Sequence, residues 1–562
     1  MRSETNRFSL FASPARAMTA AFALSVLAGC AHAPGGQDAA PYLDTPAGAV
    51  RGTWHGDVAS FRGIPYAEAP VGELRWRAPV PKAAWDGTRD ATAFGDSCFQ
   101  PQSQPVPGNI YHDDVGTMSE DCLSLNVWTP AEARDAPVFV WIHGGSLLTG
   151  SSSLGMYDGA RLAREGGVVV TINYRLGALG FLAHPELSAE TDENISGNYG
   201  FLDQIEALRW VERNIGAFGG DPDNVTIAGE SAGGLSAMYL MTSPLARGLF
   251  DKAVMQSAYM ISAPSLREDR HGHPAAEPHG RELQAALGAT GIAEMRAIAP
   301  RTITDRAAAT GYRTYPTVDG HVVPRQVVES FDRGEQAAIP ILAGFNAGET
   351  RSLRVLLPKA PASAADYERA IGAAYGADAS RFLDIYPSAS MDESMLGVVR
   401  DALYGWTAQR LGTGQQAIGE PAYLYLFDHG YPAADEANLH AFHAAELPFM
   451  FGTIWDTAAS WPQIPREPEQ RALSDAMVAY WASFARTGRP VAPNGPDWPA
   501  FGQDKAFMVF DQHPFVARDV LADRYDLADE TVCRRRAAGD QQWNWNVGVA
   551  AAPLPQGDGQ CR

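Results

Sequence analysis

The stretch that most constrains the fold of this chain is Phe218–Gly234, which reads FGGDPDNVTIAGESAGG. A Gly-Gly-Asp-Pro turn signal precedes the apolar run Asn224–Ala228, which has the length of a buried strand. The pentapeptide GESAG at residues 229–233 follows, and apolar residues at helical spacing come after it. This order predicts a strand that turns sharply into a helix around Ser231. Glycines on both sides of the serine leave space in a turn that side chains would obstruct.

A serine in such a turn stands above the edge of the sheet, at a helix N-terminus that favours developing negative charge. The arrangement is that of a nucleophile elbow, and it makes Ser231 a candidate nucleophile. The G-x-S-x-G pentapeptide is weak evidence by itself, and an idle serine in a glycine-rich turn is the alternative. A serine nucleophile also needs a base and a carboxylate that orients the base.

The composition excludes some classes of partner. The 562 residues are 46% hydrophobic and 19% charged, which is typical of a globular protein with a sizeable core. The formal net charge of −21 argues against a nucleic-acid partner, because no basic surface dominates. The sequence has no C-x-x-C pair or His/Cys cluster typical of zinc, so we predict no metal and no cofactor. His271, His273 and His279 are predicted to lie in a solvated Pro/Gly-rich loop.

The N-terminus has the features of an export signal. Basic residues precede an apolar run at residues 17–28, which is too short to span a membrane. The run ends in LAGC at residues 27–30, which resembles the lipobox of bacterial lipoproteins and implies that Cys30 is lipidated. Signal cleavage after the AHA at residues 31–33 is the alternative.

Both interpretations, lipidation at Cys30 and ordinary signal cleavage, predict that the protein is exported from the cytoplasm. We therefore expect a signal peptide over residues 1–29 and a flexible, lipidated tether over residues 30–45. The protein is predicted to be an exported lipoprotein of the cell envelope, or otherwise periplasmic or secreted. The lipid anchor is its one expected contact with a membrane.

The cysteine count fits an oxidising compartment. The chain has five cysteines, at Cys30, Cys98, Cys122, Cys533 and Cys561. If Cys30 carries lipid, the other four are enough for two disulfides. Three pairings are possible, and the local one joins Cys98 to Cys122 and Cys533 to Cys561.

Apolar runs alternate with helical patterns along the chain. Strands are predicted over residues 123–128, 138–142, 168–173, 339–345 and 423–427, with helices over 201–215 and 471–486. This alternation predicts an α/β fold with a mostly parallel sheet. In such sheets, functional groups gather at the carboxyl ends of the strands.

A second glycine-rich turn ends the strand at residues 138–142. It reads HGGS over residues 143–146. Such a turn can be structural, but glycine also lets backbone amides approach an oxyanion closely. Each preorganised donor of this kind lowers the barrier of an acyl transfer by about 3–4 kcal/mol.

Four stretches together resemble the type-B carboxylesterases, the α/β-hydrolase family that includes the cholinesterases and the bacterial para-nitrobenzyl esterases. They are EDCLSLNV at residues 120–127, HGG at 143–145, GNYG at 197–200 leading into Asp203-Gln204, and residues 218–234. The likeness runs from about residue 45 to about residue 510. It implies an α/β-hydrolase fold with a deep gorge over the site.

The resemblance also implies a division of the chain. The catalytic domain would span residues 46–530, with helical insertions at about 260–335 and 350–418 forming the gorge walls. A C-terminal tail at residues 531–562 would follow, and a disulfide between Cys533 and Cys561 could pin it.

The resemblance further implies particular roles for backbone groups. The amides of Gly145, Ser146 and Ala232 would form the oxyanion hole, although Ser146 stands where a third glycine is usual. A Cys98–Cys122 disulfide would close a loop near the gorge mouth. In cholinesterases this loop carries a tryptophan that stacks on choline, whereas this loop has Tyr111-His112 in that region and no tryptophan. Choline esters are therefore not expected to be preferred substrates.

The acid and the base follow Ser231 in the order that α/β-hydrolases use. Glu349 comes just after the strand at residues 339–345 and matches the family's glutamate. His443 heads the segment HAAELPFMFG, which matches the family's base segment, and His440 is the nearby rival. Glu230, beside the nucleophile, is interpreted equally well as a group that tunes the histidine and as a satisfied buried carboxylate.

The sequence therefore predicts a serine hydrolase that cleaves small-molecule carboxylic esters through an acyl-enzyme, with a triad of Ser231, His443 and Glu349. One alternative is a non-catalytic binding module on a cholinesterase-like scaffold. Another is the same machinery acting on amides, thioesters or lactones, which the elbow serves equally well.

Overall fold

The computed structural model describes residues 39–102, 109–556 and 561. The predicted signal peptide, Cys30 and most of the predicted tether lie outside these residues. The last residues assigned to the tether differ from the prediction, because they form β1 (Tyr42–Thr45), which pairs antiparallel with β2 (Gly48–Arg51). The Thr45 hydroxyl donates to the Gly48 carbonyl and closes the turn between the two strands. β5 (Thr88–Asp90) completes this small sheet. Within the described residues, none of the helices is long and apolar enough to cross a membrane.

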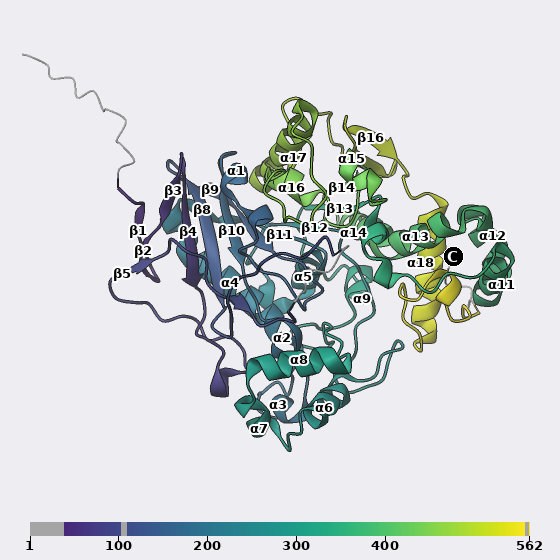
Figure 1. The fold of residues 1–562 in the computed structure, drawn as a ribbon, viewed down its shortest axis with the longest axis horizontal. Helices are drawn as coiled ribbons and strands as arrows, with labels where there is room; N and C mark the ends of the chain where they lie inside the picture. The colour runs from purple at the N-terminus through teal and green to yellow at the C-terminus, as the bar shows by residue number, and fades with distance from the viewer. Residues whose placement is uncertain (1–38, 103–108, 557–560, 562) are drawn as a thin grey trace, which may run out of the picture. The chain divides into compact units, whose positions relative to one another are not determined.

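The main sheet contains eleven strands among the described residues, in the order β16-β15-β14-β13-β12-β11-β9-β10-β8-β4-β3 (Figure 1). Its strands are β3 (Thr53–His55), β4 (Val58–Pro65), β8 (Ser124–Pro130), β9 (Ala136–Ile142), β10 (Val168–Ile172), β11 (Gly220–Glu230), β12 (Lys252–Gln256), β13 (Ile341–Asn346), β14 (Ala422–Phe427), β15 (Ala506–Phe510) and β16 (Phe515–Arg518). From β10 through β15 every neighbouring pair is parallel, and the strands at both edges are antiparallel. The predicted mostly parallel sheet is therefore confirmed.

The sheet separates two hydrophobic cores, because successive residues of a strand point to opposite faces. In β9, Val140 and Ile142 belong to one core, whereas Phe139 and Trp141 belong to the other. Long apolar runs without alternation, such as the one at 138–142, are explained by this burial on both faces.

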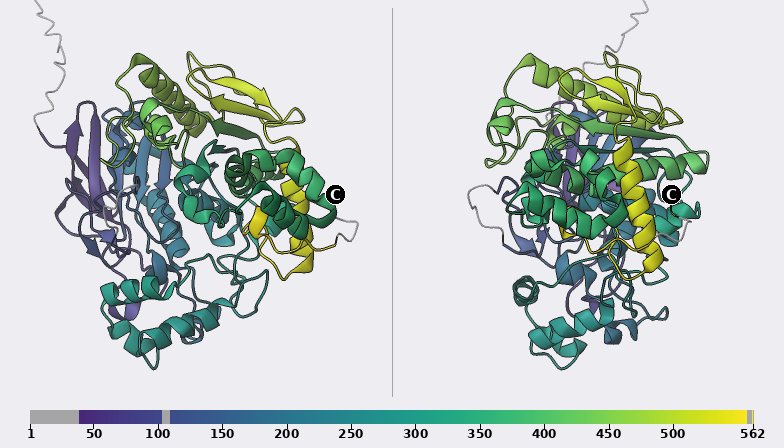
Figure 2. Two further views of the ribbon diagram at one scale, coloured as in Figure 1. Left: turned by 45° about the vertical axis from the view of Figure 1, so that its right-hand side comes forward. Right: turned by 90° about the vertical axis from the view of Figure 1, so that its right-hand side faces the viewer.

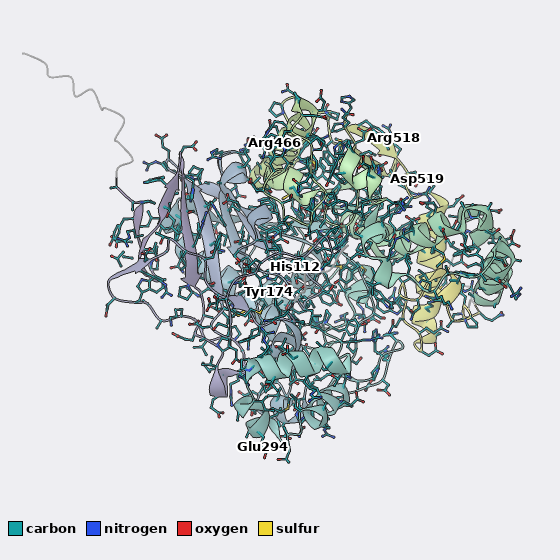
Figure 3. The ribbon with its side chains drawn as sticks, in the orientation of Figure 1. His112, Tyr174, Glu294, Arg466, Arg518 and Asp519 are labelled. Carbon is teal, nitrogen blue, oxygen red and sulfur yellow. A yellow bond between two sulfur atoms is a disulfide. The ribbon has the colours of Figure 1, made fainter. Side chains whose placement is uncertain are left out.

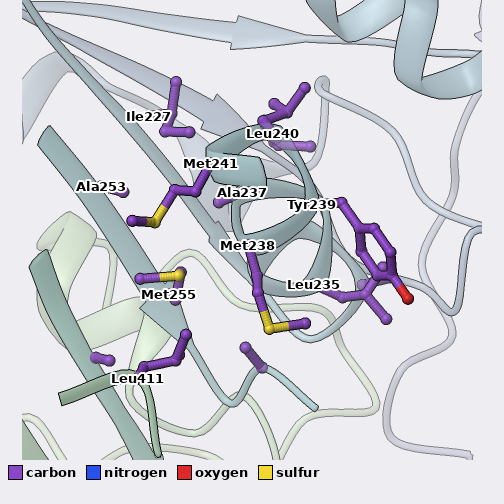
Figure 4. Close-up of a cluster of buried hydrophobic side chains, with 14 of the residues drawn as sticks. Ile227, Leu235, Ala237, Met238, Tyr239, Leu240, Met241, Ala253, Met255 and Leu411 are labelled. Carbon is purple, nitrogen blue, oxygen red and sulfur yellow. The ribbon is translucent and has the colours of Figure 1, made fainter. Parts of the chain in front are cut away.

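Helices cover each face of the sheet. The first face is covered by α4 (Tyr199–Asn214), α5 (Ala232–Thr242) and α14 (Trp406–Ala417), and the second by α1 (Ala160–Ala163), α16 (Leu447–Phe451) and α17 (Pro468–Thr487). Figure 4 shows Met238 and Met241 of α5 on the side of the helix that faces Met255 and Ala253 of β12. α5 is buried along its whole length, so the helix behind Ser231 is held rigidly against the sheet.

The two predicted insertions are helical. The first contains α6 (Ala276–Ala286), α7 (Ile292–Ala297), α8 (Pro300–Thr310) and α9 (Val327–Asp332). The second contains α10 (Glu349–Ser352), α11 (Ala364–Tyr375), α12 (Ala379–Ile385), α13 (Met391–Arg400) and the π-helical turn Asp401–Gly405 that leads into α14. The remaining short helices are α2 (Gly177–Phe181), α3 (Pro185–Ser188) and α15 (Pro432–Glu436). Figure 2 shows α11, α12 and α13 beside the last helix of the chain, α18 (Asp523–Ala538).

The predicted tail packs against the rest of the fold. Its predicted start at residue 531 falls inside α18, and a disulfide joins Cys533 to Cys561. The Asn544 side-chain amide donates to the carbonyls of Met260 and Ala402, so the tail ties together two segments that follow different strands.

The tail also explains why one prediction was wrong. His271 and His273 were expected in a solvated loop, but they are only 2% and 7% exposed. The indole of Trp543, in the tail, packs edge-on against the His271 ring with centroids 5.2 Å apart, and the His271 amide donates to the Gly539 carbonyl. Within the described residues, no group of three or more His, Cys, Asp or Glu side chains could hold a metal ion.

Candidate active site

Ser231 lies in the predicted sharp turn between β11 and α5. Its φ and ψ are 55° and −119°, a conformation that a non-glycine residue adopts only when its surroundings enforce it. A side chain at Gly233 would collide with the Ile142 carbonyl, and one at Gly229 would collide with the backbone of Gly233. The two glycines of the pentapeptide are therefore required by close backbone approach.

The nucleophile turn is anchored to the neighbouring strand. The Ser231 amide donates to the Gln256 carbonyl at the end of β12, at 2.9 Å. Ser231 is 8% exposed, and α5 begins directly after it at Ala232. The Ala232 amide belongs to the first turn of the helix, where amides have no intrahelical acceptor.

The HGGS turn lies beside the nucleophile turn, because Ile142 of β9 pairs in parallel with Gly229 of β11. Among the described residues, none accepts a hydrogen bond from the amides of Gly145 and Ser146. Ser146 has a φ of 58°, in the left-handed region that favours glycine, which is in keeping with the glycine that is usual at this position. The amides of Gly145, Ser146 and Ala232 are thus all available to a ligand.

His143 supports this turn from below. Its ring is 1% exposed and stacks on Tyr174 with centroids 4.6 Å apart, and the Tyr174 hydroxyl donates to the His143 carbonyl (Tyr174 is labelled in Figure 3). Burial lowers the pKa of His143 to about 4. The ring therefore stays neutral near pH 7 and acts as packing beneath Gly144.

Glu349 and His443 are in direct contact. Glu349 is the first residue of α10 and is fully buried. Its Oε1 accepts the Asn346 amide at 2.9 Å, and its Oε2 accepts a short hydrogen bond from Nδ1 of His443. This contact directs the other ring nitrogen of His443, Nε2, away from Glu349.

The Nε2 atom of His443 faces Glu230, the residue before Ser231. It lies 3.0 Å from Oε1 of Glu230, but the two atoms are not aligned as a hydrogen bond. Within the described residues, no hydrogen bond joins the Ser231 hydroxyl to His443.

Buried charge dominates the electrostatics around His443. Burial raises the pKa of Glu230 to about 8, with the charge of His443 opposing that shift and Glu446 and Glu349 adding to it. Burial by itself lowers the pKa of His443, but the carboxylates of Glu230 and Glu349 outweigh it and raise the pKa to about 9. The protonation states of His443 and Glu230 are therefore coupled.

Glu446 was not predicted from the sequence, yet it links the segments around the site. It is fully buried, and it accepts hydrogen bonds from the side-chain amides of Gln256, at 2.9 Å, and Asn346, at 2.6 Å. Burial raises its pKa. Gln256 also holds Ser231 through its carbonyl, and the Asn346 amide holds Glu349. Gln256 and Asn346 end β12 and β13, where functional groups gather, but nothing local in the sequence relates either residue to Glu446.

Three further polar residues, among them the rival histidine His440, have different surroundings. His440 bonds to Asp428 and Asp435 at 2.9 and 3.1 Å, and its hydrogen bond with Asp428 is the largest cause of its raised pKa. His429 is buried and bonds to Gln470. Ser257 is fully buried after β12, and no described residue bonds to its hydroxyl.

The first predicted disulfide borders the site. Cys98 and Cys122 are bonded, with Cα atoms 5.0 Å apart, and β6 (Ser97–Cys98) pairs in parallel with β7 (Met118–Ser119) inside the closed loop. Tyr111 of this loop packs edge-on against the ring of His443, with centroids 6.5 Å apart. The loop therefore reaches the base segment directly.

This arrangement has the parts that an acyl transfer requires. A serine stands at a helix N-terminus, a histidine is oriented by a buried carboxylate, and free backbone amides flank the serine. Such a site can attack a carbonyl carbon and stabilise the oxyanion that forms.

Comparison with known proteins agrees with this chemistry. The model of the carboxylesterase family matches residues 39–528. The chain is 36% identical to the fumonisin B1 esterase of Sphingopyxis macrogoltabida, covering 83% of this chain and 85% of that one. It is 35% identical to the para-nitrobenzyl esterase of Bacillus subtilis, covering 85% and 96% of the two chains.

Solved structures give the same relationship. A PNB esterase structure aligns with a TM-score of 0.75 and 32% identity, covering 86% of this chain and 98% of that one. A carboxylesterase structure from Geobacillus stearothermophilus aligns with a TM-score of 0.68 and 33% identity, covering 89% and 99%. The chain has the α/β-hydrolase fold, is a carboxylic ester hydrolase and belongs to the carboxylesterase family.

Proposed function

We propose that Ser231, His443 and Glu349 form the catalytic triad of this ester hydrolase. The observation that carries the proposal is the contact between Glu349 and Nδ1 of His443, beside the sharp turn that presents Ser231. A buried carboxylate on Nδ1 selects the tautomer whose Nε2 can accept a proton.

In the proposed reaction, Oγ of Ser231 attacks the ester carbonyl carbon while its proton passes to Nε2 of His443. The amides of Gly145, Ser146 and Ala232 hold the oxyanion. The bond between the carbonyl carbon and the alkoxy oxygen then breaks, and His443 returns the proton to the leaving alcohol. Water attacks the acyl-enzyme by the same steps, which releases the acid and restores Ser231.

The first step requires the Ser231 hydroxyl to bond to Nε2 of His443, which faces Glu230 at 3.0 Å in the unliganded site. We propose that the Ser231–His443 hydrogen bond forms when substrate excludes water and fills the site.

The test is hydrolysis of p-nitrophenyl esters, from acetate to laurate, by the wild type and by Ser231→Ala. We expect activity to vanish in Ser231→Ala and to persist in the control Ser390→Ala, which changes an exposed serine on the second insertion. A properly folded wild type that is inert towards the whole series and towards a labelled fluorophosphonate would favour the alternative of a non-catalytic binding module.

The natural substrate is a second part of the proposal. Relatives are named for fumonisin B1, para-nitrobenzyl esters, phenmedipham and pyrethroids, which differ widely in size. We propose a small-molecule carboxylic ester as the substrate class. Matched amide, thioester and lactone analogues belong in the same assay, because the elbow chemistry serves them all. A larger kcat/KM for one of these analogues than for the ester would replace the ester as the preferred substrate.

We also propose that Cys30 is lipidated and becomes the mature N-terminus when residues 1–29 are removed, so that a tether beginning at Cys30 links the catalytic domain to the cell envelope. The LAGC sequence at residues 27–30 supports this proposal. Mass spectrometry of the mature N-terminus in a bacterial host is the test. A diacylglyceryl mass on Cys30 is expected, whereas an unmodified N-terminus after residue 33 would indicate ordinary signal cleavage.

A further inference from the structure

Tyr111 is a residue of the disulfide-closed loop that bonds to the segments of both the acid and the base. Its hydroxyl donates to the His443 carbonyl at 2.8 Å. The same hydroxyl lies 2.7 Å from Oγ of Ser352, which is the last residue of the helix that begins with Glu349. One phenol therefore touches the backbone of the predicted base and the helix of the predicted acid.

The direction of these two hydrogen bonds follows from the number of protons. The His443 carbonyl can only accept, so the single proton of Tyr111 points to it. Ser352 is then the donor to the Tyr111 oxygen, since its other acceptor, the Glu349 carbonyl, lies further away at 3.4 Å. The bonds form a directed chain from Ser352 through Tyr111 to His443.

The position of Tyr111 is set from outside the triad. The Ser460 hydroxyl donates to the carbonyls of Ile110 and His112, at 3.1 and 3.0 Å, and so holds the backbone on both sides of Tyr111. The Tyr111 ring also packs edge-on against Trp461, with centroids 6.1 Å apart. Figure 3 labels His112, the next residue of the loop.

Burial of the hydroxyl keeps it protonated. Tyr111 is 38% exposed as a residue, and the desolvation of its hydroxyl among the neighbouring side chains raises its pKa well above the ordinary value. The phenol is therefore a permanent donor to the His443 carbonyl over the pH range in which an esterase works.

A purely structural role for the chain of hydrogen bonds is the alternative. The segments of Glu349 and His443 are already joined by a backbone hydrogen bond from the Gly348 amide to the Ala441 carbonyl, at 2.8 Å. Because that bond holds the two segments together without Tyr111, the phenol is not needed to form this part of the fold. The Tyr111 hydroxyl bonds to the backbone carbonyl of His443, so it acts on the alignment of the imidazole that this backbone carries.

We infer that Tyr111 is a positioning residue for the base, which fixes the His443 backbone against the helix of Glu349 so that Nε2 stays within reach of Ser231. This inference rests on the proposed triad. It gives the Cys98–Cys122 loop a part in the chemical steps, because the loop supplies the group that aligns the base.

The experiment compares Tyr111→Phe with Ser352→Ala, with the double variant and with Tyr367→Phe. The last is the matched control, because it removes a phenol that also donates to a backbone carbonyl, that of Tyr386, in the remote second insertion. The readouts are kcat and KM on a p-nitrophenyl ester, together with the melting temperature.

We expect Tyr111→Phe to lower kcat and kcat/KM equally, by about three- to tenfold, the factor typical of one lost hydrogen bond. KM and the melting temperature should stay close to those of Tyr367→Phe. Ser352→Ala should lower kcat less than Tyr111→Phe does. In the double variant, Ser352→Ala should not lower kcat below that of Tyr111→Phe alone. The inference would be overturned if Tyr111→Phe had the same kcat as Tyr367→Phe. It would also be overturned if Ser352→Ala lowered kcat by the same factor in the wild type and in Tyr111→Phe.

A measurement without turnover separates this inference from the proposed function. The proton on Nδ1 of His443, which is shared with Glu349, should give a low-field resonance in the ¹H NMR spectrum. Tyr111→Phe should shift or broaden that resonance, and Tyr367→Phe should not. If the wild type does not hydrolyse esters, the proposed function fails while this measurement still decides whether Tyr111 positions His443. An unchanged resonance in Tyr111→Phe would contradict the inference even in an active enzyme.

Discussion

Oε1 of Glu230 lies 3.0 Å from Nε2 of His443, the ring atom that would take the proton of Ser231. Glu230 is also the residue next to Ser231 in the chain, so the nucleophile turn itself brings a carboxyl to the base. Burial raises the pKa of Glu230 to about 8. The two groups are therefore coupled: the negative charge of Glu230 raises the pKa of His443, and the positive charge of His443 opposes the rise in the pKa of Glu230.

The first prediction concerns this pair. Glu230→Gln removes a carboxylate that raises the pKa of His443, so the acid limb of the kcat/KM profile should move to lower pH, by about one unit. The measurement is the pH dependence of kcat/KM on a p-nitrophenyl ester. Glu436→Gln, an exposed glutamate, is the control. A limb that stays in place or moves to higher pH would show that Glu230 does not tune His443.

The second prediction concerns the acid. Glu349→Gln keeps the shape of the side chain but removes the charge that holds the Nδ1 proton of His443, so kcat should fall about a thousand- to ten-thousandfold. Steady-state kinetics checks this, with Glu393→Gln as the control because Glu393 is an exposed carboxylate paired with Arg351. A loss of less than tenfold would exclude Glu349 as the acid of the triad.

The third prediction concerns the nucleophile turn. In Gly233→Ala the new methyl group would collide with the Ile142 carbonyl, so the turn has to shift, at a cost of about 1–3 kcal/mol in the free energy of unfolding. Gly216→Ala, where the methyl group meets nothing within 4 Å, should be neutral. Thermal unfolding and ester hydrolysis are the measurements. Equal melting temperatures and activities in the two variants would contradict the geometry of the turn.

The fourth prediction concerns stability in acid. Burial, helped by the charges of Arg270 and Arg536, lowers the pKa of His271 to about 4, while the unfolded chain titrates near 6.5. Between these values the unfolded state binds more protons, so the free energy of unfolding should fall as the pH drops from about 6.5 to about 4. For this residue the slope is at most about 1.4 kcal/mol per pH unit.

The variant His271→Phe should flatten the dependence of the melting temperature on pH within this window, because a phenylalanine can pack against Trp543 without titrating. The exposed His513→Phe is its control and should leave the dependence unchanged. The same slope in His271→Phe as in the wild type would mean that other groups control stability in acid.

Much of the sheet was predictable because its signals are local. The apolar runs at residues 138–142, 168–173 and 423–427 are strands within one or two residues of the predicted bounds. These strands are buried on both faces, so nearly every residue in them is apolar and the runs stand out from the flanking loops. The turn at Ser231 was predictable for a related reason, because backbone crowding leaves glycine as the residue that fits on both sides.

The network around Glu446 was not predictable, because its members lie far apart in the sequence. Gln256 and Asn346 are separated from Glu446 by 190 and 100 residues, and each has an ordinary polar side chain in its own segment. The parallel order of the strands brings the ends of β12 and β13 together, and that order depends on the packing of the whole sheet.

By itself, the sequence determined the family, the nucleophile turn and the order in which Ser231, Glu349 and His443 follow one another, because each of these residues is marked by a short motif of its own. The tertiary structure decided that His443 faces Glu230, that the tail buries His271, and that Tyr111 bonds to the base segment. These contacts join segments that no local pattern relates. They form only when the sheet, the insertions and the tail pack together and exclude water, which also changes the pKa values of the groups they bury.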